Sequence, residues 1–236
     1  MTSTLTPIKI LSTLAVRNVL NEIAPDYVRR TGRMLEMTFA ATLQIRDKIL
    51  GGARADITIM TANAVDEFER SGILVAGGRV DLVGSDIGLA IRQGDAVPDV
   101  STVDALKAAL VQARAVAYSE RGASGVYFSG LLKKLGIADE INARAVIIPE
   151  GLTGTRLVSG EADFAVQQMS ELMQVPGINI FAKLPQAVQE TTIFSIGIFK
   201  DAQDKRAVAE LIAFLRSPAV TTMLRDQGLD PLSAAA

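Results

Sequence analysis

The sequence predicts an α/β fold, because strand-like and helix-like segments alternate along almost the whole chain. Short apolar runs are followed by stretches whose apolar residues recur at i, i+3, i+4 and i+7, the spacing of one helix face. Several of these runs end in small segments that contain hydroxyl groups or glycine and that open a helix. A chain of 236 residues is long enough for one large domain or for two lobes of roughly 100 residues each.

In the first half of the chain, an apolar helical stripe begins at Val16. Pro25 marks a potential kink in this helix, and Gly32 is expected to end it. A second helix is expected from about Thr42, and Asn63 is expected to cap a third. The expected strands are, in order, Ile8–Leu11, Leu35–Phe39, Asp56–Met60, Val80–Val83 and Gly88–Arg92.

The second half continues the same alternation and ends in two helices. The segment Ser101–Asp104 resembles a capping box in which Asp stands in place of Glu or Gln, and it opens a helix. Ser217 is expected to cap the last helix, with Pro218 at its first position and Gly228 at its end. The expected strands are Val116–Tyr118, Val146–Ile148, Phe164–Gln168, Ile178–Phe181 and Thr192–Phe199.

The composition restricts the chemistry that the protein can perform. The chain contains no Cys, His or Trp, which excludes zinc sites built from thiolate and imidazole and nucleophile systems that depend on His. Acid–base chemistry must therefore use Asp, Glu, Lys, Tyr, Arg or water. No metal and no cofactor is expected. Disulfides cannot form, so cysteine usage does not report the redox compartment.

Charge and hydropathy indicate which partners to expect. The net charge of −2 gives no bulk attraction to nucleic acid or acidic membranes. No segment approaches the run of about 20 apolar residues that a membrane span needs, so no membrane insertion is expected. The N-terminal stretch Met1–Pro7 lacks the features of a secretory leader, and as written the protein is expected to be cytoplasmic. A leader removed before this chain begins would place it in the periplasm.

Three strand-to-helix junctions suggest binding of a small anion. The first turn of a helix carries backbone N–H groups without intrahelical partners at the positive end of the helix dipole, and small hydroxyls add further donors. The same residues also have a structural interpretation, as N-caps in the first two junctions and as a turn in the third. The junctions are Ser12-Thr13-Leu14, Ala40-Ala41-Thr42 and Gly122-Ala123-Ser124-Gly125.

From about Ile8 to Pro231 the chain resembles the molybdate-binding substrate-binding proteins, a family with the type II periplasmic-binding-protein fold. Each motif is weak alone, and the resemblance rests on their order and spacing. The motifs are Ile8–Ser12, Phe39–Thr42 with Leu43 and Arg46-Asp47, Asp56–Ile59, Ser119 with Gly122–Gly125, Gly160–Asp163 leading into Val166–Gln168, and Phe214–Pro218.

The resemblance implies two α/β lobes joined by two crossover strands, with a ligand cleft between the lobes that closes by a hinge motion. Lobe 1 would hold residues 1–85 plus 198–236, and lobe 2 residues 86–197. Gly88–Arg92 and Ile193–Phe199 are the candidate crossover segments, because both are extended and lie beside glycine. The implied partners are a small anionic ligand and, if the protein is exported, the permease of an ABC transporter.

The family's ligand contacts carry over to four groups of residues. They fall on Ser12 and Thr13, on Ala41 and Thr42, on Ser124 and Gly125, and on Gly151 and Thr153. Gln168 stands where the molybdate binders commonly have Tyr. This difference puts the identity of the ligand in doubt, since a Gln amide both donates and accepts hydrogen bonds.

The pair Gln167-Gln168 also resembles a subgroup that includes aconitate isomerase, so two functions stay open. One is a solute-binding protein for a molybdate-like oxyanion or a small carboxylate, and the other is an isomerase of an unsaturated carboxylic acid. An isomerase needs a base within reach of the substrate, and Tyr118 and Glu120 are the nearest candidates. Arg121 is the candidate for a forked contact to a carboxylate. Each of these side chains also has a plain structural interpretation.

Overall fold

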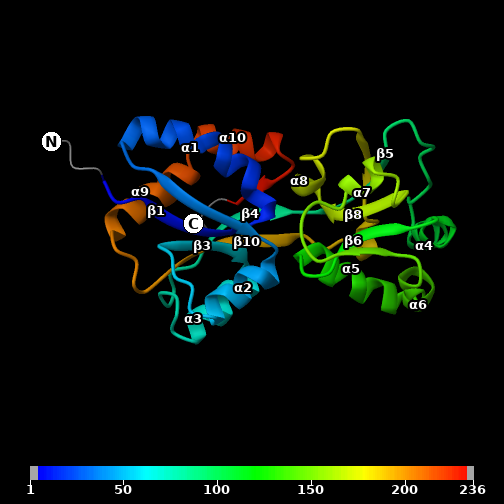
Figure 1. Ribbon diagram of the computed structural model, residues 1–236, viewed down its shortest axis with the longest axis horizontal. Coiled ribbons are helices and arrows are strands. Elements are labelled where there is room, and N and C mark those ends of the chain that lie inside the picture. The colour runs from blue at the N-terminus through cyan, green and yellow to red at the C-terminus, as the bar shows by residue number, and fades with distance from the viewer. Residues whose placement is uncertain (1–4, 233–236) are drawn as a thin grey trace. The chain divides into compact units, whose positions relative to one another are not determined.

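The computed structural model describes residues 5–232, which divide into two compact units (Figure 1). Unit 1 comprises the residues up to Gly84 and from Ile193 onward, and unit 2 comprises Ser85–Thr192. The chain leaves unit 2 at Ile193, earlier than the boundary expected near residue 198. The reason is that the strand beginning at Thr192 already pairs with the sheet of unit 1 from Phe194. The first crossing follows Gly84 and therefore precedes Gly88–Arg92, which lies inside unit 2.

Unit 1 is built on a six-stranded mixed sheet with the order β11-β4-β10-β3-β1-β2. Strand β1 runs parallel to both β2 and β3, whereas β10 is antiparallel to β3. Because β1 to β3 are parallel, their carboxyl ends lie at one edge of the sheet. The strands are β1 (Ile8–Thr13), β2 (Leu35–Ala40), β3 (Ile57–Thr61), β4 (Val80–Ser85), β10 (Thr192–Ile198) and β11 (Asp230–Pro231).

Helices cover both faces of this sheet. In Figure 1, α1, α9 and α10 lie on one face and α2 and α3 on the other. On the first face, the rings of Tyr27 and Phe214 are 5.3 Å apart and join α1 to α9. On the second face, Ile45, Phe68 and Met60 are fully buried in one cluster. The helices are η1 (Leu14–Val16), α1 (Arg17–Thr31), α2 (Thr42–Leu50), α3 (Ala62–Arg70), α9 (Lys205–Leu215) and α10 (Pro218–Asp226).

The helix ends test the capping predictions. Helix α1 is continuous through Pro25, and Gly32 ends it as expected with φ 72°, donating its N–H to the Val28 carbonyl. The prediction for Asn63 was wrong, because Thr61 is the N-cap of α3 and Asn63 lies in its first turn. The capping box at Ser101 was also wrong: Thr102 caps α4 alone, and its hydroxyl accepts the Ala105 N–H at 3.1 Å.

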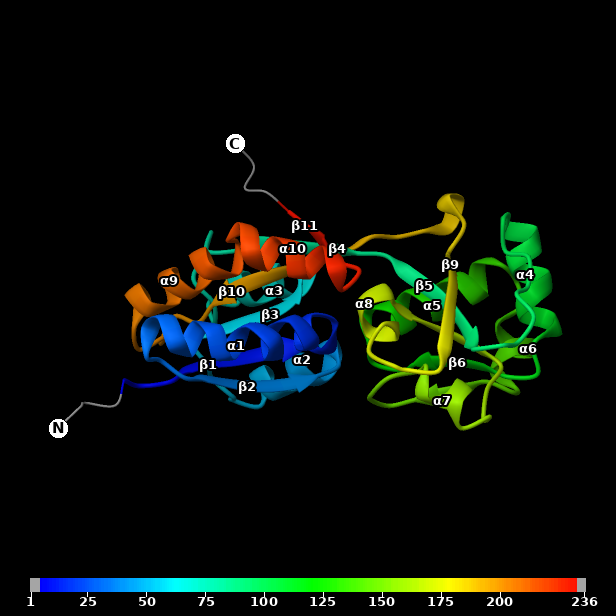
Figure 2. The same ribbon diagram turned by 90° about the horizontal axis from the view of Figure 1, so that it is seen from above.

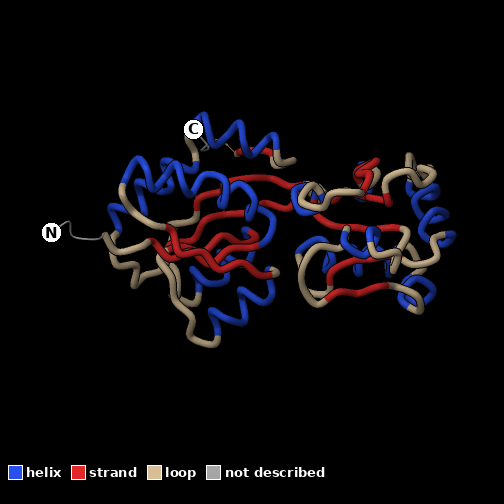
Figure 3. Tube along the Cα trace, turned by 45° about the horizontal axis from the view of Figure 1, so that its top comes forward, coloured by secondary structure: helices blue, strands red, loops and turns tan. Residues whose placement is uncertain are grey.

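Unit 2 contains a five-stranded mixed sheet with the order β7-β6-β8-β5-β9. Strand β6 is parallel to β7 and β8, while β5 is antiparallel to β8 and β9. Strands and helices alternate here as they do in unit 1 (Figure 3). The elements are β5 (Ile87–Arg92), α4 (Val103–Gln112), β6 (Val116–Ser119), α5 (Ala123–Lys134), α6 (Ala138–Asn142), β7 (Val146–Ile148), α7 (Thr155–Val158), β8 (Phe164–Gln168), α8 (Met169–Leu172), β9 (Ile178–Lys183) and η2 (Gln186–Val188).

The two faces of this second sheet are packed differently. One face carries large side chains, including Tyr118, Phe128 and Phe164. The other is rich in alanine, including Ala117 and Ala165, which leaves room for the short helices α7 and α8 to pack closely. Neighbouring residues of β6 therefore face two different environments, and this separates Tyr118 from Ser119.

Among residues 5–232, no single helix is long and apolar enough to cross a membrane. The consecutive helices α9 and α10 pass that criterion only as a pair, by length and composition, and they are bent by 57° relative to each other.

Candidate functional site

The first two predicted junctions meet at one edge of the sheet of unit 1. Strands β1 and β2 are parallel neighbours in which Thr13 pairs with Ala40, so the chain leaves both strands at the same level. The short helix η1 follows Thr13 directly, and α2 begins at Thr42. Two helix starts with their positive dipole ends are thereby placed side by side.

Thr13 is the unusual residue of this edge. It is 2% exposed, and its hydroxyl has no hydrogen-bond partner among the described residues. It occupies the N-cap position of η1, but its side chain makes no capping hydrogen bond, so capping does not account for its hydroxyl. Ser12, in contrast, donates its hydroxyl to the Thr13 carbonyl at 3.1 Å. A buried hydroxyl without a partner costs free energy, and an anion that accepts its proton would remove that cost.

The Ala41-Thr42 junction is partly satisfied from within the chain. The Ala41 N–H, the only polar donor that this residue has, is bonded to Oε1 of Gln44 at 3.2 Å. Thr42 is buried at the first position of α2. An anion at this point would compete with the neutral amide of Gln44, and a charged acceptor makes the stronger hydrogen bond.

The third junction lies in unit 2, where β6 passes into α5. Ser124 is 1% exposed, and its hydroxyl has no hydrogen-bond partner within the described chain. The N–H groups of Ala123, Ser124 and Gly125 have no acceptor inside the helix because they belong to its first turn. Thr13 and Ser124 thus share one feature: each is a buried hydroxyl without a partner at the start of a helix that follows a parallel strand.

Ser119 is the residue on which this turn is built, and sequence reasoning did not assign it a role. Its hydroxyl accepts the Gly122 N–H at 3.1 Å. A Cβ at position 125 would lie 1.7 Å from the Ser119 carbonyl oxygen, and one at position 122 would lie 2.4 Å from its hydroxyl oxygen. The two glycines are therefore required for the first turn of α5 to sit on the end of β6. The feature of the sequence that could have predicted this role is a Ser three residues before Gly122, a spacing at which a Ser hydroxyl can accept the N–H of a turn.

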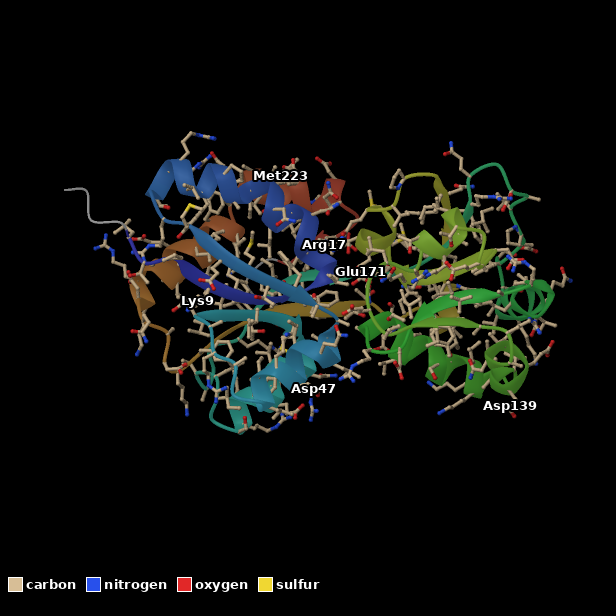
Figure 4. All side chains as sticks on the ribbon, in the orientation of Figure 1. Lys9, Arg17, Asp47, Asp139, Glu171 and Met223 are labelled. Atoms are coloured by element: carbon tan, nitrogen blue, oxygen red, sulfur yellow. The ribbon has the colours of Figure 1, made fainter. Side chains whose placement is uncertain are left out.

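The structure separates the two candidate bases. Tyr118 points into the core, where its hydroxyl donates to Oδ1 of Asn142 at 2.6 Å and its ring packs edge-on against Phe128. Burial raises the pKa of the Tyr118 phenol, which opposes its ionisation. Glu120 is exposed, and Arg121 is half-buried beside the third junction. Arg17, which lies four residues after Thr13, is half-buried at the start of α1 (Figure 4).

The fourth predicted group is held by Gln167. Thr153 donates both its N–H and its hydroxyl to Oε1 of Gln167, at 2.7 and 2.9 Å. The Gln167 amide nitrogen donates in turn to the Gly151 carbonyl at 3.0 Å. Both donors of Thr153 are thus used within unit 2, and Gly151 has φ 92°, which favours glycine. Gln167, part of the pair noted in the sequence, is the residue that fixes this loop.

Gln168 connects the two ends of unit 2. It is 1% exposed. In the amide orientation in which both the oxygen and the nitrogen have hydrogen-bond partners, the nitrogen donates to the Ser85 hydroxyl at 2.9 Å. In that orientation its oxygen accepts from the Thr192 hydroxyl, also at 2.9 Å. Ser85 and Thr192 are the first and last residues of unit 2. The amide is therefore used to tie together the two segments through which the chain enters and leaves this unit.

A second set of bonds acts at the same place. The Asp86 carboxylate accepts from Lys183 Nζ at 2.7 Å and from the Thr191 hydroxyl at 2.5 Å. Burial works against ionisation of Asp86, but the hydrogen bonds from Lys183 and Thr191 outweigh it, so the pKa of the carboxyl group is lowered. Over residues 5–232, no group of three or more Asp or Glu residues could hold a metal ion.

We expect Gly125→Ala to destabilise the protein by about 3 kcal/mol or more, because the new methyl group would overlap the Ser119 carbonyl. Gly130→Ala is the matched control in the same helix, since nothing lies within 4 Å of its Cβ position. It is expected to stabilise by about 0.5–1 kcal/mol through helix propensity. Thermal unfolding followed by circular dichroism measures both. Equal effects of the two variants would contradict the close packing of α5 on Ser119.

We expect Asp86→Asn to lower stability at pH 7 by about 1–2 kcal/mol, since Lys183 and Thr191 lose a charged acceptor and Lys183 is half exposed. A lowered pKa gives stability that is present above the ordinary Asp pKa of about 4 and is lost as pH falls through the lower folded value. The difference between wild type and variant is therefore expected to shrink below about pH 4. Melting temperatures between pH 7 and pH 3 test this, with the exposed Asp230→Asn as control. A difference that stays constant with pH would refute it.

Comparisons with known proteins identify the family. The family model for bacterial extracellular solute-binding proteins matches residues 8–230. An aconitate isomerase from Pseudomonas sp is 34% identical over 235 residues, covering 97% of this chain and 89% of the relative. These matches confirm the resemblance described above.

Solved structures share the fold. The periplasmic molybdate-binding protein of Azotobacter vinelandii has a TM-score of 0.78 at 17% identity, covering 96% of this chain and 100% of its own. The sulfate-binding protein SubI of Mycobacterium tuberculosis has a TM-score of 0.75 at 12% identity, covering 98% of this chain and 88% of its own. At these identities the likeness concerns the fold alone, and the α/β solute-binding fold expected from the sequence is confirmed.

Proposed function

This chain belongs to the bacterial extracellular solute-binding protein family, and from that premise we propose that it binds a small anion. The observation that carries the proposal is the pair of buried hydroxyls, Thr13 and Ser124, without partners among the described residues. Both stand at predicted anion contacts. Thr13 is the last residue of β1 and precedes η1, and Ser124 lies in the first turn of α5, which follows β6.

The physical basis is the supply of neutral donors at helix starts. The first turn of α5 offers N–H groups and the positive end of the helix dipole, and the Ser124 hydroxyl adds a donor in the same place. Thr13 and Thr42 offer hydroxyls at the edge of unit 1. Hydrogen bonds to a charged acceptor are shorter and stronger than those between neutral groups. Each of these two groups of residues therefore offers neutral donors to an anion.

The class of anion depends on Arg121. An oxyanion such as molybdate or sulfate needs only N–H and hydroxyl donors, and structures of this fold include proteins that bind those ions. A di- or tricarboxylate would gain from the forked guanidinium of Arg121. The isomerase relative, whose substrate by name is the tricarboxylate aconitate, favours the carboxylate class.

A second candidate function is isomerisation of an unsaturated carboxylic acid, which the 34% identity to aconitate isomerase favours. The reaction needs a base, and Tyr118 is engaged with Asn142 in the core. Glu120 is exposed and is the remaining candidate from the sequence. Proton NMR of cis-aconitate incubated with the protein distinguishes the two functions: turnover to the trans isomer establishes the enzyme, and binding without turnover establishes the binding protein.

A transporter is the partner that the family implies. The proposed partner is the permease of an ABC transporter, with the protein acting outside the cytoplasm. The family description supports this proposal.

We expect Thr13→Val and Ser124→Ala each to weaken anion binding about 10- to 100-fold, the loss of one hydrogen bond to a charged acceptor. Neither variant is expected to destabilise the ligand-free protein, because neither hydroxyl has a partner to lose. Calorimetric titration with molybdate, sulfate, citrate and both aconitate isomers, together with melting temperatures, measures the two effects.

Thr58→Val provides the matched control. Thr58 is also fully buried, but its hydroxyl donates to the Leu11 carbonyl at 3.0 Å. Its replacement is expected to cost about 1 kcal/mol of stability and to leave affinity unchanged. If Thr13→Val and Ser124→Ala behave like Thr58→Val, the two hydroxyls are structural and the proposal fails.

We expect Arg121→Ala to reduce affinity for citrate or aconitate at least 10-fold and to change affinity for molybdate little, because only the carboxylates use the planar fork. Arg92→Ala, which removes an exposed pair with Asp95, is the control and is expected to alter neither affinity. Isothermal titration calorimetry supplies both constants. Equal losses for carboxylate and molybdate would remove Arg121 from the choice of ligand.

A further inference from the structure

Unit 1 contains a cavity of about 920 Å³ that is separate from the predicted anion contacts. It is lined by α9, α10 and residues of β4, β10 and β11, which Figure 2 shows on neighbouring parts of this unit. None of Ser12, Thr13, Ala41 and Thr42 is among the lining residues. The volume falls in the range of pockets that hold small organic ligands.

The walls of this cavity are aliphatic. Leu82 and Ile198 come from the sheet, and Val208, Ile212 and Leu224 come from the two helices. Helix α10 can be found in Figure 4 by the label of Met223, which precedes Leu224 in the sequence. Such walls favour the hydrocarbon part of a ligand, since removal of apolar surface from water is favourable.

Three cations, and no acidic residue, complete the lining. They are Lys205, Arg216 and Arg225, and none has an ion pair or a side-chain hydrogen bond among the described residues. This contrasts with Arg206 on the same helix, which pairs with Glu210 at 3.0 Å. It also contrasts with Arg33, which pairs with Asp204 at 2.8 Å.

Helix dipoles do not explain all three cations. Arg216 and Arg225 lie at the C-terminal ends of α9 and α10, where a positive charge is favourable. Lys205, however, is the first residue of α9, where the dipole disfavours a cation. The shared feature is therefore the cavity itself, which combines apolar walls with one sign of charge.

We propose that this cavity binds a second ligand, an amphipathic carboxylate such as a medium-chain fatty acid. The hydrocarbon chain lies against the aliphatic walls, and the carboxylate pairs with the guanidinium of Arg216 or Arg225. A guanidinium matches a carboxylate in a forked geometry, and of the two arginines Arg216 is half-buried whereas Arg225 is exposed. The proposal does not depend on the identity of the small anion.

Decanoate, kept below its micelle concentration, is the probe for the full chain, with decanol and decylamine as neutral and cationic counterparts. We expect one decanoate per chain by calorimetry and, at 100 times the dissociation constant, a rise in melting temperature of about 5–10 °C. The double variant R216Q/R225Q is expected to weaken decanoate binding at least 10-fold and to leave decanol binding unchanged. Its affinity for molybdate or aconitate is expected to equal that of the wild type.

Ala213→Trp gives a second measurement, because it fills the cavity without changing charge. It is expected to abolish binding of decanoate and of decanol. Absence of decanoate binding in the wild type, or equal binding by R216Q/R225Q, would overturn the proposal. Sedimentation gives a further outcome that would overturn it: a dimer that decanoate does not dissociate but that Ala213→Trp converts to a monomer. The cavity face would then be an interface between two copies of the chain.

Discussion

The first N–H groups of a helix have no acceptor within that helix, and each start must find one elsewhere. Two helices of this protein solve the problem with a side chain, Thr102 at α4 and Asp204 at α9. The N-cap side chains at the starts of η1, α2 and α5 make no capping hydrogen bond, and at α2 only the Ala41 N–H is taken up, by Gln44. Helices α2 and α5 follow the parallel strands β2 and β6, and Thr13 is the last residue of the parallel strand β1. Open N–H groups at such helix starts are suited to an anion, and the proposed function rests on this.

A missing cap is not sufficient to define a site. Helices α3 and α10 also lack a side-chain cap, and the hydroxyl of Ser217 at α10 is likewise without a partner. Ser217, however, is only half-buried and follows a helix, not a strand. Thr13 and Ser124 combine near-complete burial with an unused donor beside a helix start that follows a parallel strand. Ser170, in the first turn of the short helix α8 after β8, shares these features. Thr13 and Ser124 differ from Ser170 in that they also stand at the ligand contacts that the resemblance implies. Gln168, which the resemblance places at the ligand, bonds to Ser85 and Thr192, and its neighbour Gln167 holds the loop at Thr153.

Much of the fold could be predicted because its signals are local. Strands β7 and β8 have the bounds expected from the apolar runs, and Gly32 ends α1 in the left-handed conformation that glycine favours. Capping was predicted less well, because the start of a helix is uncertain by one or two residues in the sequence: α3 begins one residue before Asn63 with no side-chain cap, and Thr102, next to Ser101, caps α4. The site needed information that no local pattern holds: the Tyr118 hydroxyl is bonded to Asn142, 24 positions away, and Gln167 reaches a residue 14 positions away.

The central claim is that the helix starts after β1 and β6 receive the anion. Backbone amide NMR during titration with molybdate, and separately with trans-aconitate, tests it most directly. The account predicts saturable shifts at Thr13, Thr42 and Ala123–Gly125 with at least one of the two ligands, at a common dissociation constant. Saturable binding that leaves these amides unchanged while others shift would contradict it.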